Sequence, residues 1–135
     1  MRRISIAIVV IHAALNLAHG AAHKNLNIPM NSWQNVYILV VIVLLPLVAG
    51  YQIWKRSRSG YVLLFLSMLG ALVFGAYYHF VLPGADNVSA QALHAAHSWA
   101  HVFQASAMLL AAVELTGVVV GGRALAGLSK SYPKS

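Results

Sequence analysis

The sequence predicts an all-α integral membrane protein built as a bundle of four transmembrane helices. Of its 135 residues, 60% are hydrophobic and only 8% are charged, whereas a water-soluble domain carries about 25% charged residues. The apolar residues are gathered in four runs, each close to the ~20 residues that cross a bilayer. These runs predict helices over about 4–22, 33–54, 61–82 and 90–120, which together form a single membrane domain over 1–135.

The first run, 4–22, is expected to be a helix of the bundle. Arg2 and Arg3 before it, and the small residues at its end, also resemble a signal peptide. His12 and Asn16 would be unusual inside the apolar part of such a peptide. We therefore expect the segment to be retained.

Turn and cap residues set the limits of the other three helices. Asn31 and Ser32 precede the second helix as cap residues, and Pro83 stops the third. Ser89 can cap the fourth helix. At 1.5 Å per residue that helix would be about 45 Å long, so its first turns should project above the membrane or tilt.

The basic residues predict the orientation, because loops rich in Lys and Arg stay in the cytoplasm. The chain contains nine Lys and Arg residues and only two acids, which gives a net charge of +7. They flank apolar runs, which indicates a lipid bilayer as partner and no nucleic acid. We expect both termini to be cytoplasmic in the cell (inner) membrane, since Lys24 alone falls at the outer end, against Arg2, Arg3, Lys55, Arg56, Arg58, Arg123, Lys130 and Lys134.

Six of the seven histidines fall at the predicted outer end. On the first helix, spacings of four, three and four place His12, Asn16, His19 and His23 in one stripe. The fourth helix carries a similar stripe with spacings of three and four. Two facing stripes of imidazoles favour a metal site in the bundle core. The expected ligands are His19, His23, His79, His94, His97 and His101.

The rest of the composition narrows the choice of metal. The chain has no cysteine and only two acids, Asp86 and Glu114, which argues against thiolate sites and against di-iron carboxylate chemistry. Imidazole ligands suit copper or zinc, and six of them can divide around two metals. A redox metal would indicate an oxidoreductase with a redox partner, and zinc a hydrolase. The substrate would be lipid-soluble or extracytoplasmic.

Two other functions compete with a metalloenzyme. A single haem b or another tetrapyrrole could lie against the small residues near His79, giving an electron-transfer protein. Metal uptake or storage is the second, in which His12 and Asn16 would continue the stripe inward as a conduction path. For any one histidine, an interfacial side chain without a ligand is the simpler interpretation.

The remaining polar residues predict supporting roles. Asp86 could complete the metal shell or hold a ligand imidazole through its second N–H. Glu114 lies opposite the histidine stripe of its helix, so we expect it outside the metal site, paired with His12 as a proton relay or as a tie between helices. Gly117 and Gly121 form a GxxxG motif, which permits a close helix contact or a homo-oligomer.

Overall fold

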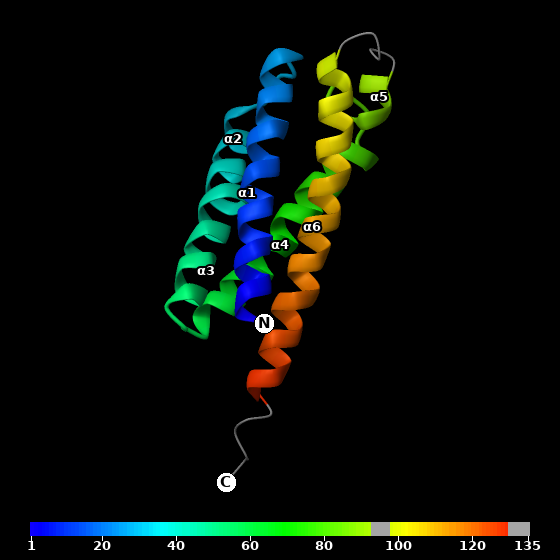
Figure 1. Cartoon of the computed structure of the whole chain (residues 1–135). Helices are drawn as coiled ribbons and strands as arrows, with labels where there is room; N and C mark the ends of the chain where they lie inside the picture. Colours follow the sequence, from blue (N-terminus) through cyan, green and yellow to red (C-terminus); the bar gives the residue numbers. More distant parts are fainter. Residues whose placement is uncertain (93–97, 130–135) are drawn as a thin grey trace.

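The computed structural model describes residues 1–92 and 98–129, and all its regular elements there are helical. The four predicted helices are confirmed, and each is long and apolar enough to span a membrane. A short helix, α5, follows the third (Figure 1). The elements are α1 (Arg2–Asn25); the continuous run of α2 (Ser32–Tyr37), η1 (Ile38–Leu44) and α3 (Leu45–Trp54); α4 (Ser59–Ala76) continued by η2 (Tyr77–Val81); α5 (Val88–Ala92); and α6 (Ser98–Ser129).

The helices alternate in direction and form a square bundle. α1 packs against α3 and α6, and α4 packs against the same two helices. α1 and α4 therefore lie on a diagonal, so side chains from both can meet on the bundle axis. The first residue of α1 and the last turns of α6 lie at the same end of the bundle (Figure 1).

Local chemistry explains where the helices begin and end. Asn31 and Gln34 form a capping box at the start of α2, each side chain accepting from the other's backbone N–H. η2 ends at Val81, just before Pro83. Ser89 was expected to cap the next helix, but that helix begins at Val88, and the side chain of Asn87 accepts from the backbone N–H of Ser89.

The last helix differs most from expectation. The structure gives α5 over Val88–Ala92 and α6 from Ser98 onward, while 93–97 lie outside the described residues. α6 continues past Val120 to Ser129. Its extra turns follow from a sequence that is free of proline up to that point.

Two apolar clusters close the bundle at its two ends. The larger one lies nearer the end where α1 begins and contains Ile8, Val9, Ala49, Ile53, Leu64 and Met68. The smaller one, at the opposite end, is formed by Ala22, Ile28 and Phe103. Between the clusters, buried histidines and one buried acid lie among apolar side chains.

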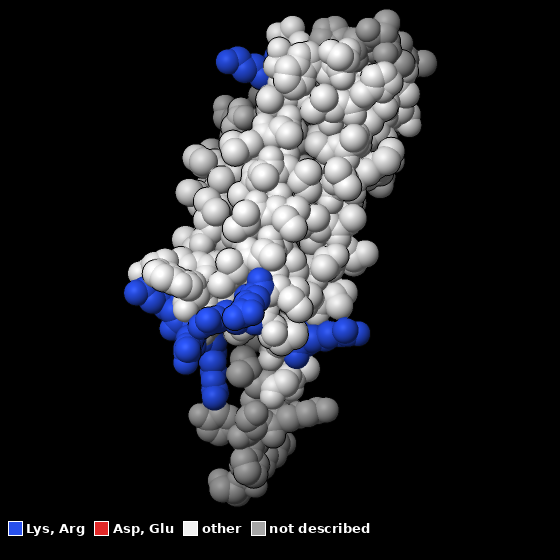
Figure 2. Space-filling view, in the orientation of Figure 1, with Lys and Arg blue, Asp and Glu red and all other residues white. Residues whose placement is uncertain are grey.

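Charged and large apolar side chains occupy different parts of the surface. Basic residues gather at the end where α1 begins, which we call the basic end, and one lies at the opposite end, which we call the histidine end (Figure 2). Among the described residues the basic end holds Arg2, Arg3, Lys55, Arg56, Arg58 and Arg123, and the histidine end holds Lys24, all exposed. The uncharged body between them exposes many large apolar side chains, as a surface facing lipid does.

The GxxxG glycines make a close contact inside the chain. A Cβ at Gly117 would lie 2.7 Å from Cγ of Met68, and one at Gly121 would lie 3.1 Å from Cα of Phe65. Both glycines are buried against α4. The close helix contact that the motif predicted is thus made between α6 and α4, and the homo-oligomer stays a prediction.

Gly60 is expected to be essential for the packing of α4 on α3. A Cβ there would lie 2.7 Å from the backbone nitrogen of Ile53 and 3.0 Å from the backbone oxygen of Ala49. Neither backbone atom can move aside, so Gly60→Ala should lower the stability by about 1–3 kcal/mol. Gly127→Ala is the control, because a Cβ there meets no atom of the described residues within 4 Å. Thermal unfolding in detergent, followed by circular dichroism, measures both; equal melting temperatures would contradict this packing.

Candidate metal centre

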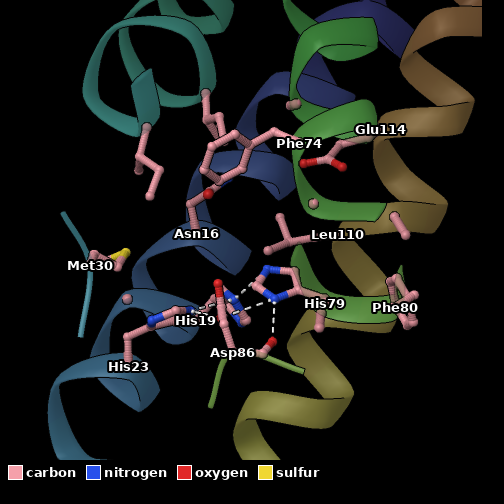
Figure 3. A pocket seen from close by; sticks show the side chains of 17 residues that line it. Asn16, His19, His23, Met30, Phe74, His79, Phe80, Asp86, Leu110 and Glu114 are labelled. Carbon is pink, nitrogen blue, oxygen red and sulfur yellow. Dashed lines mark hydrogen bonds and ion pairs between the residues drawn. The ribbon is translucent and has the colours of Figure 1, made fainter. Parts of the chain in front are cut away.

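Three histidines from two diagonal helices meet near the histidine end. His19 and His23 are four residues apart on α1 and share one face of it, and His79 lies in η2. All three are buried, with exposed fractions of 8%, 6% and 9%. Figure 3 shows their rings turned toward one another at one end of a pocket.

The Nε2 atoms of these rings converge on one point. Nε2 of His19 lies 3.2 Å from Nε2 of His23 and 3.2 Å from Nε2 of His79. The nitrogens of all three lie within 4.8 Å of one another. A tetrahedral zinc ion with Zn–N bonds of 2.0–2.1 Å holds its ligand nitrogens about 3.3 Å apart. The buried triad could therefore hold a transition metal with little rearrangement.

The protonation of His19 follows from its contact with α6. Its Nδ1 lies 2.8 Å from Oγ of Ser106. Ser106 has one hydroxyl hydrogen, and Oγ lies 2.6 Å from the backbone oxygen of Val102, which can only accept. Ser106 therefore accepts from Nδ1–H of His19, and in the neutral ring Nε2 carries only a lone pair.

The protonation of His79 follows from the loop after η2. Its Nδ1 lies 3.0 Å from the backbone oxygen of Asp86 and 3.1 Å from Oδ1 of the same residue. Both neighbours are acceptors, so Nδ1 carries the hydrogen and Nε2 of the neutral ring carries a lone pair. The lone pairs of His19 and His79 face each other at 3.2 Å. Such a contact is repulsive unless a proton or a metal ion lies between the two nitrogens.

Asp86 brings a negative charge to the edge of the triad. Its Oδ1 lies 3.1 Å from Nε2 of His23 and 3.1 Å from Nδ1 of His79. Burial alone would raise the pKa of this carboxyl, but the contacts with the two imidazoles outweigh burial and hold the pKa below its usual range. Asp86 is thus an anion at neutral pH, and it can orient His79 while offsetting the charge of a bound cation.

Phe103 and η2 fix the positions of the rings. Phe103 is fully buried, and its ring centroid lies 4.8 Å from that of His19, 5.2 Å from that of His23 and 5.5 Å from that of His79. η2 is wider than an α-helix, and its π-type hydrogen bond joins the N–H of Leu82 to the oxygen of Tyr77 at 2.7 Å. His79 is the buried residue of this segment.

Of the other three predicted ligands, the structure describes His101. His101 is exposed on α6 and lies outside the triad, so its role as a ligand stays a prediction. His94 and His97 lie outside the described residues. Sequence reasoning missed Ser106 and Phe103. The signal that could have found them is the helical spacing along the inner face of α6, where Ser106, Ala107, Leu110 and Glu114 follow Phe103 by three, four, seven and eleven residues.

A cavity extends from the triad toward the middle of the bundle. The space open to water-sized molecules in it is about 90 Å³. The triad and Asp86 line one end, while Asn16 and Glu114 line it farther in (Figure 3). Glu114 was expected to lie apart from the metal site. It shares the cavity instead, because α6 turns its Glu114 face inward and its His101 face outward.

His12, Asn16 and Glu114 form a second polar group. Nε2 of His12 lies 3.2 Å from Oε1 of Glu114 and 3.1 Å from Nδ2 of Asn16. The pair joins α1 to α6, as expected for a tie between helices. It lies one to two helical turns below His19, so His12 is too far away to share a metal with the triad.

The donor set indicates which chemistry the centre can perform. Three imidazoles and one nearby carboxylate form a donor set that could hold a transition metal. No protein-family model, curated protein or solved structure matches the chain. The triad can bind a cation, and the cavity gives a small molecule access to it.

Ser106 should tune the affinity for metal through His19. Ser106→Ala removes the acceptor for Nδ1–H of His19 while leaving all three Nε2 atoms in place. Loss of such a partner typically lowers metal affinity 10–100-fold. Thr116→Ala is the matched control, because its hydroxyl donates to the backbone oxygen of Ala112 on the exposed side of the same helix. Competition titration with a zinc-binding dye gives both dissociation constants, and equal values would contradict the proposed hydrogen bond.

Proposed function

We propose that the chain is an integral membrane metalloprotein that binds one zinc or copper ion through His19, His23 and His79. The four apolar helices support insertion in a membrane. The basic end supports an orientation with both termini in the cytoplasm, because cytoplasmic loops carry the excess of Lys and Arg. In this orientation the metal lies near the extracytoplasmic surface.

The observation that carries the proposal is the convergence of three buried imidazole nitrogens. A buried polar group without a partner costs free energy in an apolar interior. Here the hydrogen-bond partners of Nδ1 aim Nε2 of His19 and of His79 at each other at 3.2 Å. A shared proton would relieve the repulsion between these two nitrogens, whereas a metal ion would relieve it and also engage the third converging imidazole, His23.

The same geometry favours a single ion over the other ligands considered. A haem bound between His19 and His79 would place its iron and ring between their Nε2 atoms, which leaves no position for the converging His23. A second metal would need ligands beyond the three that converge. Asp86 contacts His23 and His79 from the rim, where it orients the rings and offsets charge.

The cavity favours a catalytic centre over a conduction path. Catalytic zinc sites typically use three protein ligands and leave the fourth position open. Apolar side chains, including Ile38, Phe74 and Leu110, line most of the cavity beside the triad. Nearer the basic end than His12, Asn16 and Glu114 lies the larger apolar cluster, whose members offer no imidazole or carboxylate to a moving ion. The centre therefore suits chemistry on a lipid-soluble or extracytoplasmic molecule, as an oxidoreductase with copper or a hydrolase with zinc.

Metal analysis of the purified protein tests the binding site. We expect about one zinc or copper atom per chain, because one set of three ligands converges. Alanine at His19, His23 or His79 should abolish stoichiometric metal, since each loses a ligand. His101→Ala is the control, because the exposed His101 lies outside the triad. A Soret band with stoichiometric iron would overturn the proposal, as would loss of metal in the His101 variant alone.

Binding of a small anion tests the open position. Azide added to the Cu(II)-loaded protein should bind the metal from the cavity side and produce a new charge-transfer absorption band. The Ala71→Phe variant should weaken this binding at least tenfold, because Ala71 is fully buried and lines the cavity. Phe at exposed Leu69, on the same helix, serves as the control. If azide leaves the wild-type spectrum unchanged, the metal has no open position and the catalytic assignment fails.

A further inference from the structure

A second hollow, which we call the lateral groove, opens between α1 and the run of η1 and α3. Figure 1 shows these elements side by side. α1 lines the groove with His12 and Asn16 among apolar side chains, and the opposite wall is wholly apolar. Leu17 on one wall is 78% exposed and Leu47 on the other is 45% exposed. The mouth of the groove therefore faces the lipid.

The lateral groove lies near the middle of the membrane span. α1 runs from Arg2 to Asn25, so His12 lies about 15 Å from the basic end, which is half of the roughly 30 Å hydrocarbon core. Phospholipid headgroups do not reach this depth. A polar atom that opens to the groove therefore needs a partner from the protein, or from a molecule that dissolves in hydrocarbon.

One ring nitrogen of His12 is such an atom. Nε2 lies 3.2 Å from Oε1 of Glu114, which orients the ring. Nδ1 has no hydrogen-bond partner among the residues that the structure describes, and it is not fully enclosed by them. His12 is only 1% exposed, and it lines the lateral groove but not the cavity beside the triad. Nδ1 therefore opens to the lateral groove.

A hydroxyl group fits Nδ1 of His12 in either protonation state. A ring nitrogen donates when it carries a hydrogen and accepts when it carries a lone pair, and a hydroxyl can take the complementary part in both cases. A buried carboxyl group that orients a histidine toward a hydroxyl is also a recurring arrangement in proteins. The acyl chain of a phospholipid could fill the groove, but it would leave Nδ1 without a partner.

The size of the lateral groove suits a ring with an apolar tail. The space open to water-sized molecules in it is about 220 Å³. An apolar cavity of about 150 Å³ is enough to hold benzene. A phenol ring can therefore enter the groove, and its tail can leave between Leu17 and Leu47 toward the lipid.

We propose that the lateral groove binds a lipid-soluble alcohol or phenol through Nδ1 of His12. The hydroxyl group forms a hydrogen bond with Nδ1, while Glu114 holds the ring from Nε2. The apolar part of the ligand packs between Ala13 on α1 and Val43 on the opposite wall. None of the three triad histidines lines the groove. The site therefore lies beyond the proposed function and does not require the metal.

NMR of the purified protein, labelled with ¹⁵N at histidine and held in phosphatidylcholine nanodiscs, tests the contact directly. Phosphatidylcholine has no hydroxyl group that could imitate the ligand. para-Octylphenol should shift the Nδ1 resonance of His12 saturably. Octylbenzene, which has the same ring and tail without the hydroxyl, should leave this resonance in place and bind about tenfold more weakly. An unshifted Nδ1 resonance with the phenol, or equal effects of the two molecules, would overturn the proposal and leave the metal site untouched.

Two variants test whether the phenol lies in the lateral groove. Ala13→Phe should fill the groove beside His12 and weaken binding of the phenol about tenfold. Ala14→Phe is the matched control, because Ala14 is exposed and lines neither the groove nor the cavity. Leu47→Trp closes the mouth from the opposite wall at an exposed position, which keeps the test decisive if Ala13→Phe disturbs the fold. Undiminished binding in a folded groove variant, judged by circular dichroism, contradicts the proposal.

Discussion

The structure depends on one constraint, which is that every polar side chain inside an apolar bundle needs a partner. The chain has only two acids and uses both to hold histidines. Glu114 pairs with His12 and thereby joins α6 to α1. Asp86 contacts His23 and His79 and thereby joins the loop after η2 to α1. The two acids thus determine which helix faces turn inward and which imidazoles can meet.

Much of this arrangement can be predicted from the sequence, because it follows from short-range periodicity. Runs of apolar residues near membrane length predict the four helices, and all four are present. A spacing of four places His19 and His23 on one face whatever the tertiary structure. The position of His79 at the end of its apolar run predicts that it lies at the same end of the bundle. These inferences need only the geometry of single helices.

The orientation of the last helix could not be predicted in this way, because it depends on which polar face is costlier to expose. Glu114 and His101 lie on nearly opposite faces of α6, and the histidine pattern favoured the His101 face as the inner one. The structure buries Glu114 and exposes His101. An acid facing lipid costs more than a histidine near the membrane surface, and Glu114 finds a partner in His12. Ser106 and Phe103 share the face of Glu114, and they become part of the site for that reason.

η2 was also beyond prediction, because a wider turn has no sequence signature.

The distribution of contacts among the helices also determines which side of the centre can open. The triad comes from α1 and η2, Ser106 comes from α6 and Asp86 from the loop after η2, so a bound ion would hold these elements together. The α2, η1 and α3 run supplies no ligand and no partner to a ligand, only apolar side chains along the cavity. These side chains are Ile38 and Ile42, and both lie in the π-helical segment η1. Among the described residues, the wall that this run contributes to the cavity is therefore the part that makes no contact with the histidines.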